Sequence, residues 1–441
     1  MATTIGIRKE DKNRWERRAP LSPADVGRLR ARGGMEFVVQ SSPTRVFSDS
    51  EYRAAGATVT ADLGAADIIL AVKEIPAGVL IPGKTYAFFS HVIKGQRQNM
   101  PMLARILELG CSLLDYERIV DERERRLLFF GRHAGNAGAI DTLWCLGQRL
   151  LALGIPTALA DLRIAHEYDS LAEAKKHLSA VGQRLRSEGL PAEISPLVVG
   201  IAGYGNVSKG AQEVLAALPA TVIPVADLAK VCAGHGSPGE PIVSVVFTER
   251  DMVRPASPGT PFVLEEYYRQ PEKYVSRFEE VLPFLDVLLN TIYWTERYPR
   301  FVTRDWARRA WTAASRPRLK VVGDISCDID GSIELTVKTT TPDAPAYVID
   351  PVSGSIGDGI EGNGLAIMAI DNLPCQLPRE ASEHFGSVLR EMVSDLAAAD
   401  WRAGFDELGL PPHLEKAVIA HHGALTPSYQ YLEAFLRTAT S

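Results

Sequence analysis

The stretch Leu197-Val-Val-Gly-Ile-Ala-Gly203-Tyr-Gly205-Asn-Val-Ser-Lys-Gly210 decides the fold of this chain. An apolar run typical of a buried strand ends at two glycines, and a helical pattern continues to Leu218. Such a turn lets the backbone approach a pyrophosphate and directs a helix N-terminus at it. The third glycine comes later than in the usual G-x-G-x-x-G pattern. By itself the motif is therefore also compatible with a simple tight turn.

The composition is that of a globular protein with two or three domains. The chain has 441 residues, of which 46% are hydrophobic and 23% charged, and its net charge is −6. The negative charge disfavours a nucleic-acid face, and no apolar run approaches the roughly 20 residues that span a membrane. The five cysteines are scattered without a C-x-x-C pair, so we expect neither a metal site nor disulfides. The N-terminus lacks a signal-peptide pattern, and we expect a cytoplasmic protein that is a monomer or a dimer.

Two series of alternating strands and helices flank the glycine motif. In residues 1–130 the strand-like runs are 36–40, 67–73, 85–90 and 111–115, with helical patterns beginning at Ser22 and Met100. A long apolar helix over 135–153 leads to the second series, whose further strands we expect at 221–225, 285–290 and 319–324. The segment 232–283 is rich in glycine, proline and charge, and we interpret it as an insertion with a helical second half. Residues 377–396 and 412–436 look helical.

We therefore predict an α/β fold with two doubly wound, Rossmann-like domains and a cleft between them. Residues 1–130 plus about 381–441 form a substrate domain, to which the C-terminal helices return. Residues 131–380 form the nucleotide-binding domain. Nearly two hundred residues thus precede the glycine motif and need a role of their own.

Two titratable side chains follow neighbouring predicted strands of the first domain. Lys73 ends the run 67–73, and His91 follows the run 85–90. Ligands of open α/β sheets bind at the carboxyl ends of the strands. Desolvation there lowers a lysine pKa and makes the amine usable as an acid or base. Each residue alone is also compatible with a structural role, but their shared placement favours a proton-transfer site.

Two further segments carry candidate binding residues. Arg17 and Arg18 precede a helix start and suit bidentate capture of a carboxylate, although a surface salt-bridge cluster explains them equally well. Arg126 is ambiguous in the same way. Asp371 precedes a proline-punctuated turn, where it either binds a substrate ammonium or caps the turn.

In this order, these segments resemble the lysine–2-oxoglutarate reductase module, the saccharopine-forming N-terminal half of the bifunctional aminoadipic semialdehyde synthases. The resemblance covers nearly the whole chain and includes the late third glycine. The chain also resembles, more distantly, alanine dehydrogenase and the N-terminal part of transhydrogenase. The stretches that carry it are Ile5-Gly-Ile-Arg-Lys-Glu-Asp11, Trp15-Glu-Arg-Arg-Ala-Pro-Leu21, Lys84-Thr-Tyr-Ala-Phe-Phe-Ser-His91, Gly203 to Gln212, Glu272 to Phe278, Asn290-Thr-Ile-Tyr-Trp294, Gly323 to Asp328 and Ile370 to Glu380.

The resemblance implies roles for individual residues. Lys73 and His91 match the acid/base pair. The implied substrate-binding residues are Arg18, Lys94, Glu117, Arg126 and Asp371. The implied cofactor-binding residues are Gly203, Tyr204, Gly205, Asn206, Val207, Gly210, Ile292, Tyr293 and Asp324. One departure is His133, which stands where the resemblance leads us to expect an aromatic residue.

The implied activity is an NAD(P)-dependent oxidoreductase that condenses L-lysine with 2-oxoglutarate to saccharopine, the first step of lysine degradation. The resemblance favours NADPH, with NAD as the alternative. Asp227, about 24 residues beyond Gly203, is the candidate for a ribose 2′-hydroxyl, whereas Lys230 or Arg250 could neutralise a 2′-phosphate. Alternative functions are an NAD-dependent, lysine-forming saccharopine dehydrogenase, an alanine dehydrogenase and a non-catalytic nucleotide sensor.

Overall fold

The chain divides into two compact units, each with its own sheet. The computed structural model describes residues 2–235, 239–314 and 317–439. The first unit combines Met1–Phe130 with Pro378–Ser441, and the second comprises Gly131–Leu377. Within the described residues, each unit contains one eight-stranded sheet.

The sheet of the first unit has the strand order β18-β17-β6-β5-β4-β1-β2-β3. Its first six strands in sequence are parallel to one another. They are β1 (Thr3–Ile7), β2 (Met35–Gln40), β3 (Thr58–Thr60), β4 (Ile68–Leu70), β5 (Thr85–Phe88) and β6 (Ser112–Asp115). Because β4, β5 and β6 are adjacent and parallel, the residues that follow them meet at one edge of the sheet.

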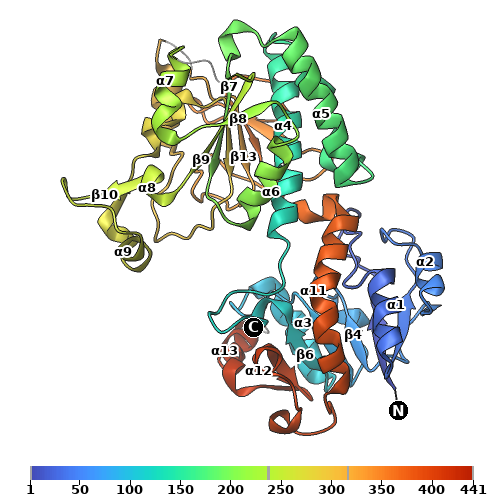
Figure 1. The fold of residues 1–441 in the computed structure, drawn as a ribbon. Coiled ribbons are helices and arrows are strands. Elements are labelled where there is room, and N and C mark those ends of the chain that lie inside the picture. Colours follow the sequence, from blue (N-terminus) through green and yellow to red (C-terminus); the bar gives the residue numbers. More distant parts are fainter. Residues whose placement is uncertain (1, 236–238, 315–316, 440–441) are drawn as a thin grey trace. The chain divides into compact units, whose positions relative to one another are not determined.

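Helices cover this sheet, and α11 lies against both α1 and β1 (Figure 1). The helices of this unit are α1 (Pro23–Arg32), α2 (Asp49–Ala54), α3 (Met100–Glu108), α11 (Pro378–Ala398), α12 (Pro412–Glu415) and α13 (Leu432–Ala439). The predicted start of α1 is confirmed: the Ser22 hydroxyl accepts the Asp25 amide at 3.2 Å, and the Asp25 carboxylate accepts the Ser22 amide at 3.0 Å. This reciprocal cap satisfies two amides that a helix start leaves unpaired.

The expectation of a helical segment over 412–436 was wrong in its middle. Residues Val418–His421 form β17, which pairs antiparallel with β6, and Ala424–Leu425 form β18. All four residues of β17 are buried. The strand is short and is buried on both faces of the sheet. A sequence pattern cannot distinguish such a run from a buried helical turn. Its pairing with β6 decides the outcome.

The sheet of the second unit has the order β15-β14-β16-β13-β12-β7-β9-β8. It is parallel except at β14, which runs antiparallel to both of its neighbours. The strands are β7 (Leu197–Ala202), β8 (Ala220–Val222), β9 (Ile242–Phe247), β12 (Val287–Asn290), β13 (Val321–Asp324), β14 (Ala346–Ile349), β15 (Ile356–Asp358) and β16 (Leu365–Met368). Alternate residues of β7 enter two different apolar cores, Leu197 on one face and Val198 on the other. A parallel sheet buried on both faces has this pattern.

Two glycines allow close contact between helices of this unit. Its helices are α4 (Gly131–Ala152), α5 (Leu171–Glu188), α6 (Asn206–Leu215), α7 (Leu228–Cys232), α8 (Glu249–Met252), α9 (Leu264–Arg269) and α10 (Arg304–Thr312). A Cβ on Gly210 would lie 2.0 Å from the Arg132 carbonyl oxygen, and one on Gly135 would lie 1.9 Å from that of Val207. Gly210 is therefore required for the packing of α6 on α4. The helix α4 begins one turn before the predicted residue 135.

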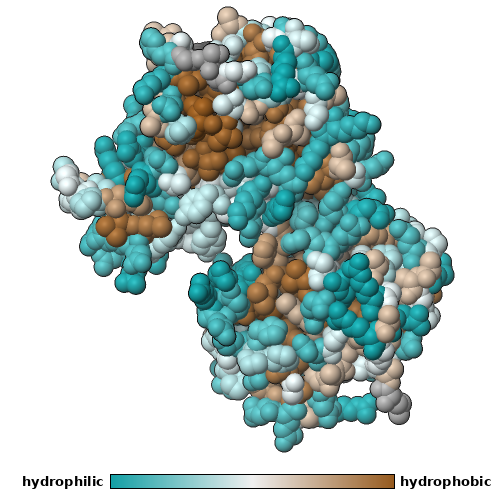
Figure 2. All heavy atoms as spheres, in the orientation of Figure 1, coloured by the Kyte–Doolittle hydropathy of each residue, from teal (hydrophilic) through white to brown (hydrophobic). Residues whose placement is uncertain are grey.

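The predicted insertion over 232–283 contains a central strand, so its interpretation as an insertion was wrong. The expected helical second half is present in part, as α9 (Leu264–Arg269) and short 3-10 helices over 271–273, 278–280 and 282–284. The strand β9 pairs with β7 over its full length, from Leu197↔Ile242 to Ala202↔Phe247. Its apolar residues are buried between two layers, which outweighs the loop-like composition around them. The rest of the segment includes the two-stranded ribbon of β10 (Val253–Pro255) and β11 (Tyr274–Ser276), with α9 between them. Figure 2 shows an apolar area on this projecting part, where Val263 and Leu264 are exposed.

Candidate active site

Three side chains gather at the carboxyl edge of the first sheet. Lys73 follows β4, His91 follows β5, and Glu117 lies in the short 3-10 helix Tyr116–Arg118 after β6. The His91 Nδ1 atom lies 3.6 Å from Glu117 Oε2, and its Nε2 atom lies 3.8 Å from Glu74 Oε1. The imidazole is therefore flanked by carboxylates on both ring nitrogens, and its side chain is 31% exposed.

The backbone at Lys73 is held by a buried carboxylate that the sequence did not single out. Glu10 accepts the amides of Val72 at 2.7 Å and Lys73 at 3.0 Å. Burial, with the nearby charge of Glu16, raises the pKa of Glu10 to about 7. Burial lowers the pKa of Lys73, and the positive charges of Arg18 and Lys12 lower it further. A larger share of Lys73 is therefore neutral near pH 7 than for an exposed lysine.

The backbone of His91 adopts an uncommon conformation. Its φ is +50°, a left-handed value that only a few per cent of non-glycine residues adopt. The Asn99 side chain donates to the His91 carbonyl at 3.0 Å, and the Phe89 ring stacks on the imidazole at 6.1 Å. These contacts offset the strain and hold the imidazole at the edge of the sheet.

Glu117 is a buried acid surrounded by positive groups. Burial acts to raise its pKa, but the His91 imidazole 3.6 Å away and the charges of Arg126 and Lys94 outweigh burial, so the pKa is lowered. Arg126 forms an ion pair with Glu117 while half of its side chain stays exposed. Lys94 is also exposed. The structure thus brings His91, Glu117 and Arg126 into one charged cluster, with Lys94 near Glu117. Lys73 is linked to this cluster through Glu74, whose pKa is lowered by both Lys73 and His91.

Arg18 is engaged inside the first unit. Its Nε and Nη2 atoms donate to the two Glu16 carboxylate oxygens at 2.8 and 2.6 Å. Its side chain is 1% exposed, and the guanidinium lies 4.3 Å from the centre of the Phe130 ring. The predicted bidentate carboxylate is therefore Glu16 of the same chain. Glu16 stands in the quoted stretch 15–21, yet nothing in its spacing reveals this pairing.

In the second unit, the glycine loop joins β7 to α6 as the sequence predicted. Gly203 has a φ of +98°, and a Cβ there would lie 3.1 Å from both Ile292 Cγ2 and Thr291 Oγ1. Gly205 is the N-cap of α6, and a Cβ there would have nothing within 4 Å. The loop therefore leaves open space directly before a helix N-terminus, which suits a phosphate group.

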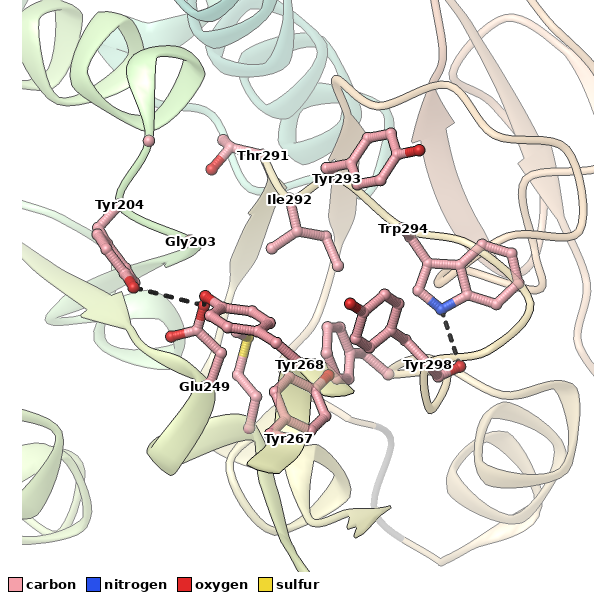
Figure 3. A pocket seen from close by; sticks show the side chains of 13 residues that line it. Gly203, Tyr204, Glu249, Tyr267, Tyr268, Thr291, Ile292, Tyr293, Trp294 and Tyr298 are labelled. Carbon is pink, nitrogen blue, oxygen red and sulfur yellow. Dashed lines mark hydrogen bonds between the residues drawn. The ribbon is translucent and has the colours of Figure 1, made fainter. Parts of the chain in front are cut away.

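A pocket of about 300 Å³ opens beside this loop, at the carboxyl ends of β7, β9 and β12 (Figure 3). Most of its lining is aromatic or apolar. The lining residues are Gly203, Tyr204, Gly205, Glu249, Met252, Tyr267, Tyr268, Thr291, Ile292, Tyr293, Trp294, Tyr298 and Phe301. The resemblance implied five of them as cofactor-binding residues, namely Gly203, Tyr204, Gly205, Ile292 and Tyr293.

Several predicted cofactor residues lie outside this lining. Asn206 and Val207 are the first residues of α6. Asp324 is buried, and its carboxylate accepts from Asn290 at 2.8 Å and from Ser326 at 2.6 Å, so it supports the ends of β12 and β13.

Two predicted acids occupy other positions in the second unit. Asp227 is the N-cap residue of α7 and lies 3.5 Å from Lys230, outside the pocket. Asp371 is exposed in the turn after β16, and the cap of the following 3-10 helix is Asn372. His133 is buried in the first turn of α4.

Comparison with known proteins relates nearly the whole chain to one group of enzymes. Residues 6–137 match the family described as alanine dehydrogenase/PNT, N-terminal domain. The chain is 38% identical to the alpha-aminoadipic semialdehyde synthase of Arabidopsis thaliana, over 97% of this chain and 41% of that protein. It is 36% identical to the mitochondrial enzyme of that name from Bos taurus, again over 97% of this chain and over 47% of that one. The chain thus spans less than half the length of these relatives.

A further curated relative and two solved structures match most of this chain and most of their own length. A saccharopine dehydrogenase [NAD(+), L-lysine-forming] from Neurospora crassa is 29% identical over 91% of this chain and 92% of that protein. An L-alanine dehydrogenase structure superposes with a TM-score of 0.63 at 17% identity, covering 98% of this chain and all of that one. A transhydrogenase from Sinorhizobium meliloti gives a TM-score of 0.56 at 16% identity, covering 96% and 100%. These likenesses confirm the predicted α/β fold with Rossmann-like domains. Among the described residues, no helix is long and apolar enough to cross a membrane.

Proposed function

We propose that this chain, whose residues 6–137 match the alanine dehydrogenase/PNT N-terminal domain family, is an oxidoreductase that forms saccharopine from L-lysine and 2-oxoglutarate. The ε-amine of lysine adds to the ketone, water leaves, and the resulting imine is reduced to a secondary amine. The observation that carries the proposal is the placement of Lys73 and His91 after adjacent strands, in a chain similar over 97% of its length to aminoadipic semialdehyde synthases.

A nicotinamide dinucleotide fits the second unit. The positive φ of Gly203, the open space at Gly205 and the pocket beside them form a cradle in which a Cβ at Gly205 would occupy free space. The amides at the start of α6 would hold the pyrophosphate, and the aromatic lining would hold apolar ring faces. When bound, the reduced nicotinamide supplies the two electrons that convert the imine to the amine.

The residues of the first unit supply proton transfers. The lysine ε-ammonium must lose a proton before it can attack the ketone, and the departing hydroxyl must gain one. Lys73, whose pKa is lowered by burial, and His91, which is partly exposed, follow adjacent strands and would take up and return these protons. Glu117 orients the His91 ring through Nδ1.

Positive side chains near this pair would receive the substrate carboxylates. Arg126 and Lys94 are exposed and lie next to Glu117, so they are available for this role. Arg18 could take part only if its pair with Glu16 opens. While this ion pair is formed, the charge of Arg18 helps to lower the pKa of Lys73. Asp371 is exposed, and its contact with a substrate ammonium stays a prediction from the resemblance.

The reverse reaction is a second candidate. The Neurospora crassa relative, which this chain matches over 92% of that protein's length, is described as NAD-dependent and lysine-forming. The same acid/base pair would serve either direction, because the proton transfers are the same steps reversed. Cytoplasmic location remains a proposal, and the bovine relative is described as mitochondrial.

One assay tests the proposal. Purified protein is mixed with L-lysine, 2-oxoglutarate and NADH or NADPH, and the absorbance of the reduced nicotinamide is followed while one component at a time is omitted. We expect loss of absorbance only in the complete mixture, and saccharopine as the product. Loss without lysine would contradict the condensation, and activity with pyruvate and ammonia would instead indicate an alanine dehydrogenase.

A further inference from the structure

We propose that Glu249 accepts hydrogen bonds from the adenosine ribose of the cofactor and makes this chain select NADH over NADPH. The inference rests on the proposed function, since it names the cofactor of the same site. It replaces the expectation of NADPH, and it moves the ribose contact from Asp227 to Glu249.

The strand order carries the first step. In dinucleotide-binding folds, the acidic residue that binds the ribose follows the strand next to the glycine-loop strand, usually the second in sequence. Here the neighbour of β7 is β9, whereas β8 lies at the edge of the sheet. Asp227 follows β8 and lies outside the pocket. Glu249 is the second residue after β9.

The pocket carries the second step. Glu249 lines it together with Gly203, Tyr204 and Gly205 of the phosphate loop. The Tyr268 hydroxyl donates to Glu249 Oε1 at 2.5 Å, and the Tyr204 hydroxyl lies 3.5 Å from the same atom (Figure 3). The carboxylate is thus fixed beside the loop by phenols, while its other oxygen, Oε2, can accept from a ribose hydroxyl.

The local helix start explains why Glu249 is available. The helix α8 begins at Glu249, but its cap is made by Thr248 and Asp251, whose carboxylate accepts the Thr248 amide at 2.8 Å. Asp251, at the third helical position, closes the cap, so the cap does not use the Glu249 carboxylate.

Charge carries the third step. Glu249 is the only charged side chain among the described residues that line the pocket. Arg250 is not part of the lining, and its guanidinium lies 5.9 Å from the centre of the Phe262 ring. Lys230 is paired with Asp227. A 2′-phosphate would therefore place its negative charge next to a carboxylate without a cation in the lining to neutralise it.

The test measures binding of NADH and NADPH separately from catalysis. Dissociation constants are obtained from nucleotide fluorescence without lysine or 2-oxoglutarate, for the wild type, Glu249→Gln and the control Asp227→Asn. We expect the wild type to bind NADH about tenfold or more tightly than NADPH, because the selective contact and the repulsion act together. Glu249→Gln should remove most of this ratio, and Asp227→Asn should leave it unchanged.

Tighter binding of NADPH by the wild type, an unchanged ratio in Glu249→Gln or a shifted ratio in Asp227→Asn would overturn the inference. If Glu249→Gln does not fold, Tyr268→Phe serves instead, since loss of the phenol that holds the carboxylate should weaken the preference for NADH. Selective NADH binding without saccharopine formation would contradict the proposed function and leave this inference standing.

Discussion

The two units have sheets of similar architecture, but the side chains at the strand ends differ in kind. In the first unit, the residues after β4, β5 and β6 include Lys73, His91 and Glu117: His91 lies 3.6 Å from Glu117, and both Lys73 and His91 lower the pKa of Glu74. In the second unit, the pocket at the ends of β7, β9 and β12 is mostly aromatic and apolar, and Glu249 is its one charge among the described lining residues. The comparison teaches that the sheet sets only the positions, and the residues after the strands set the chemistry.

The largest effect should come from removing the titratable pair. We expect Lys73→Met combined with His91→Gln to reduce saccharopine formation by about 10²–10⁴-fold or more, because no group remains to move the protons. Binding of NADH should not change, since the pocket lies within the other unit. Steady-state rates and nucleotide fluorescence measure the two quantities.

A control separates this effect from a general loss of charge. Lys416→Met combined with His413→Gln alters the same residue types in the first unit, outside the cluster. This control should keep wild-type rates. Near-wild-type turnover in the Lys73/His91 variant would contradict the proposal that the first unit supplies the proton transfers while the second unit binds the nucleotide.

The second prediction concerns the glycine that packs helices. Gly210→Ala should lower the free energy of unfolding by about 1–3 kcal/mol, because its Cβ would lie 2.0 Å from the Arg132 carbonyl oxygen. The matched control is Gly27→Ala in α1, where a Cβ meets nothing within 4 Å. That change should raise stability by up to about 1 kcal/mol through helix propensity. Denaturant unfolding compares the two, and equal effects would show that the contact between α4 and α6 is not constraining.

The third prediction uses a buried acid that lies away from the pocket. Asp141 in α4 accepts the Ala165 amide and the Gln376 side-chain amide, and burial raises its pKa to about 7 from an ordinary 3.8. The folded state therefore keeps a proton that the unfolded state loses. This contribution to stability is full below about pH 3.8 and is lost as the pH rises through about 7.

Asp141→Asn should flatten this pH dependence, by on the order of 2 kcal/mol between pH 4 and 8. An asparagine can accept the Ala165 amide and donate to Gln376 if the Gln376 amide turns over. Thermal unfolding at a series of pH values measures the effect, and Asp67→Asn, at an exposed residue, is a comparison. A variant as pH-dependent as the wild type would show that Asp141 is ionised in the folded protein.

The smallest effect should come from Gly205. Gly205→Ala should leave the unfolding transition in place, because a Cβ there has open space around it. The same methyl group would occupy the space that the pyrophosphate needs, so we expect dinucleotide binding to weaken about tenfold. Unfolding and nucleotide fluorescence measured together test this, and unchanged binding would mean that the phosphates bind elsewhere.

Local patterns predicted the parts of the fold that depend on few residues. The strand, turn and helix around Gly203 follow from an apolar run and the conformational freedom of glycine, and the cap at Ser22 follows from residues three apart. The strand-end positions of Lys73 and His91 were predictable for the same reason, because a strand end is a local event.

Other features depend on contacts between distant segments. The insertion of β9 between β7 and β8 is a pairing choice that no local pattern shows, and it places Asp227 after a strand that does not neighbour β7. The pairing of β17 with β6 is similar. Glu10 and Glu16 act through buried partners, and the burial of an acid is a property of the folded chain.

Gly210 also has a consequence for how sequence motifs are interpreted. A motif search would count Gly210 as the third glycine of the phosphate loop, at a later position than usual. Its counterpart is instead Gly135, some seventy residues earlier. At each of these two glycines, a Cβ would clash with the backbone of the other helix, so both are needed for the close packing of α6 on α4. The information that the motif carries at this position is therefore about helix packing. A related chain could replace this glycine only if α6 and α4 lay further apart, because the atom in the way is the backbone carbonyl oxygen of Arg132, which no side-chain substitution removes.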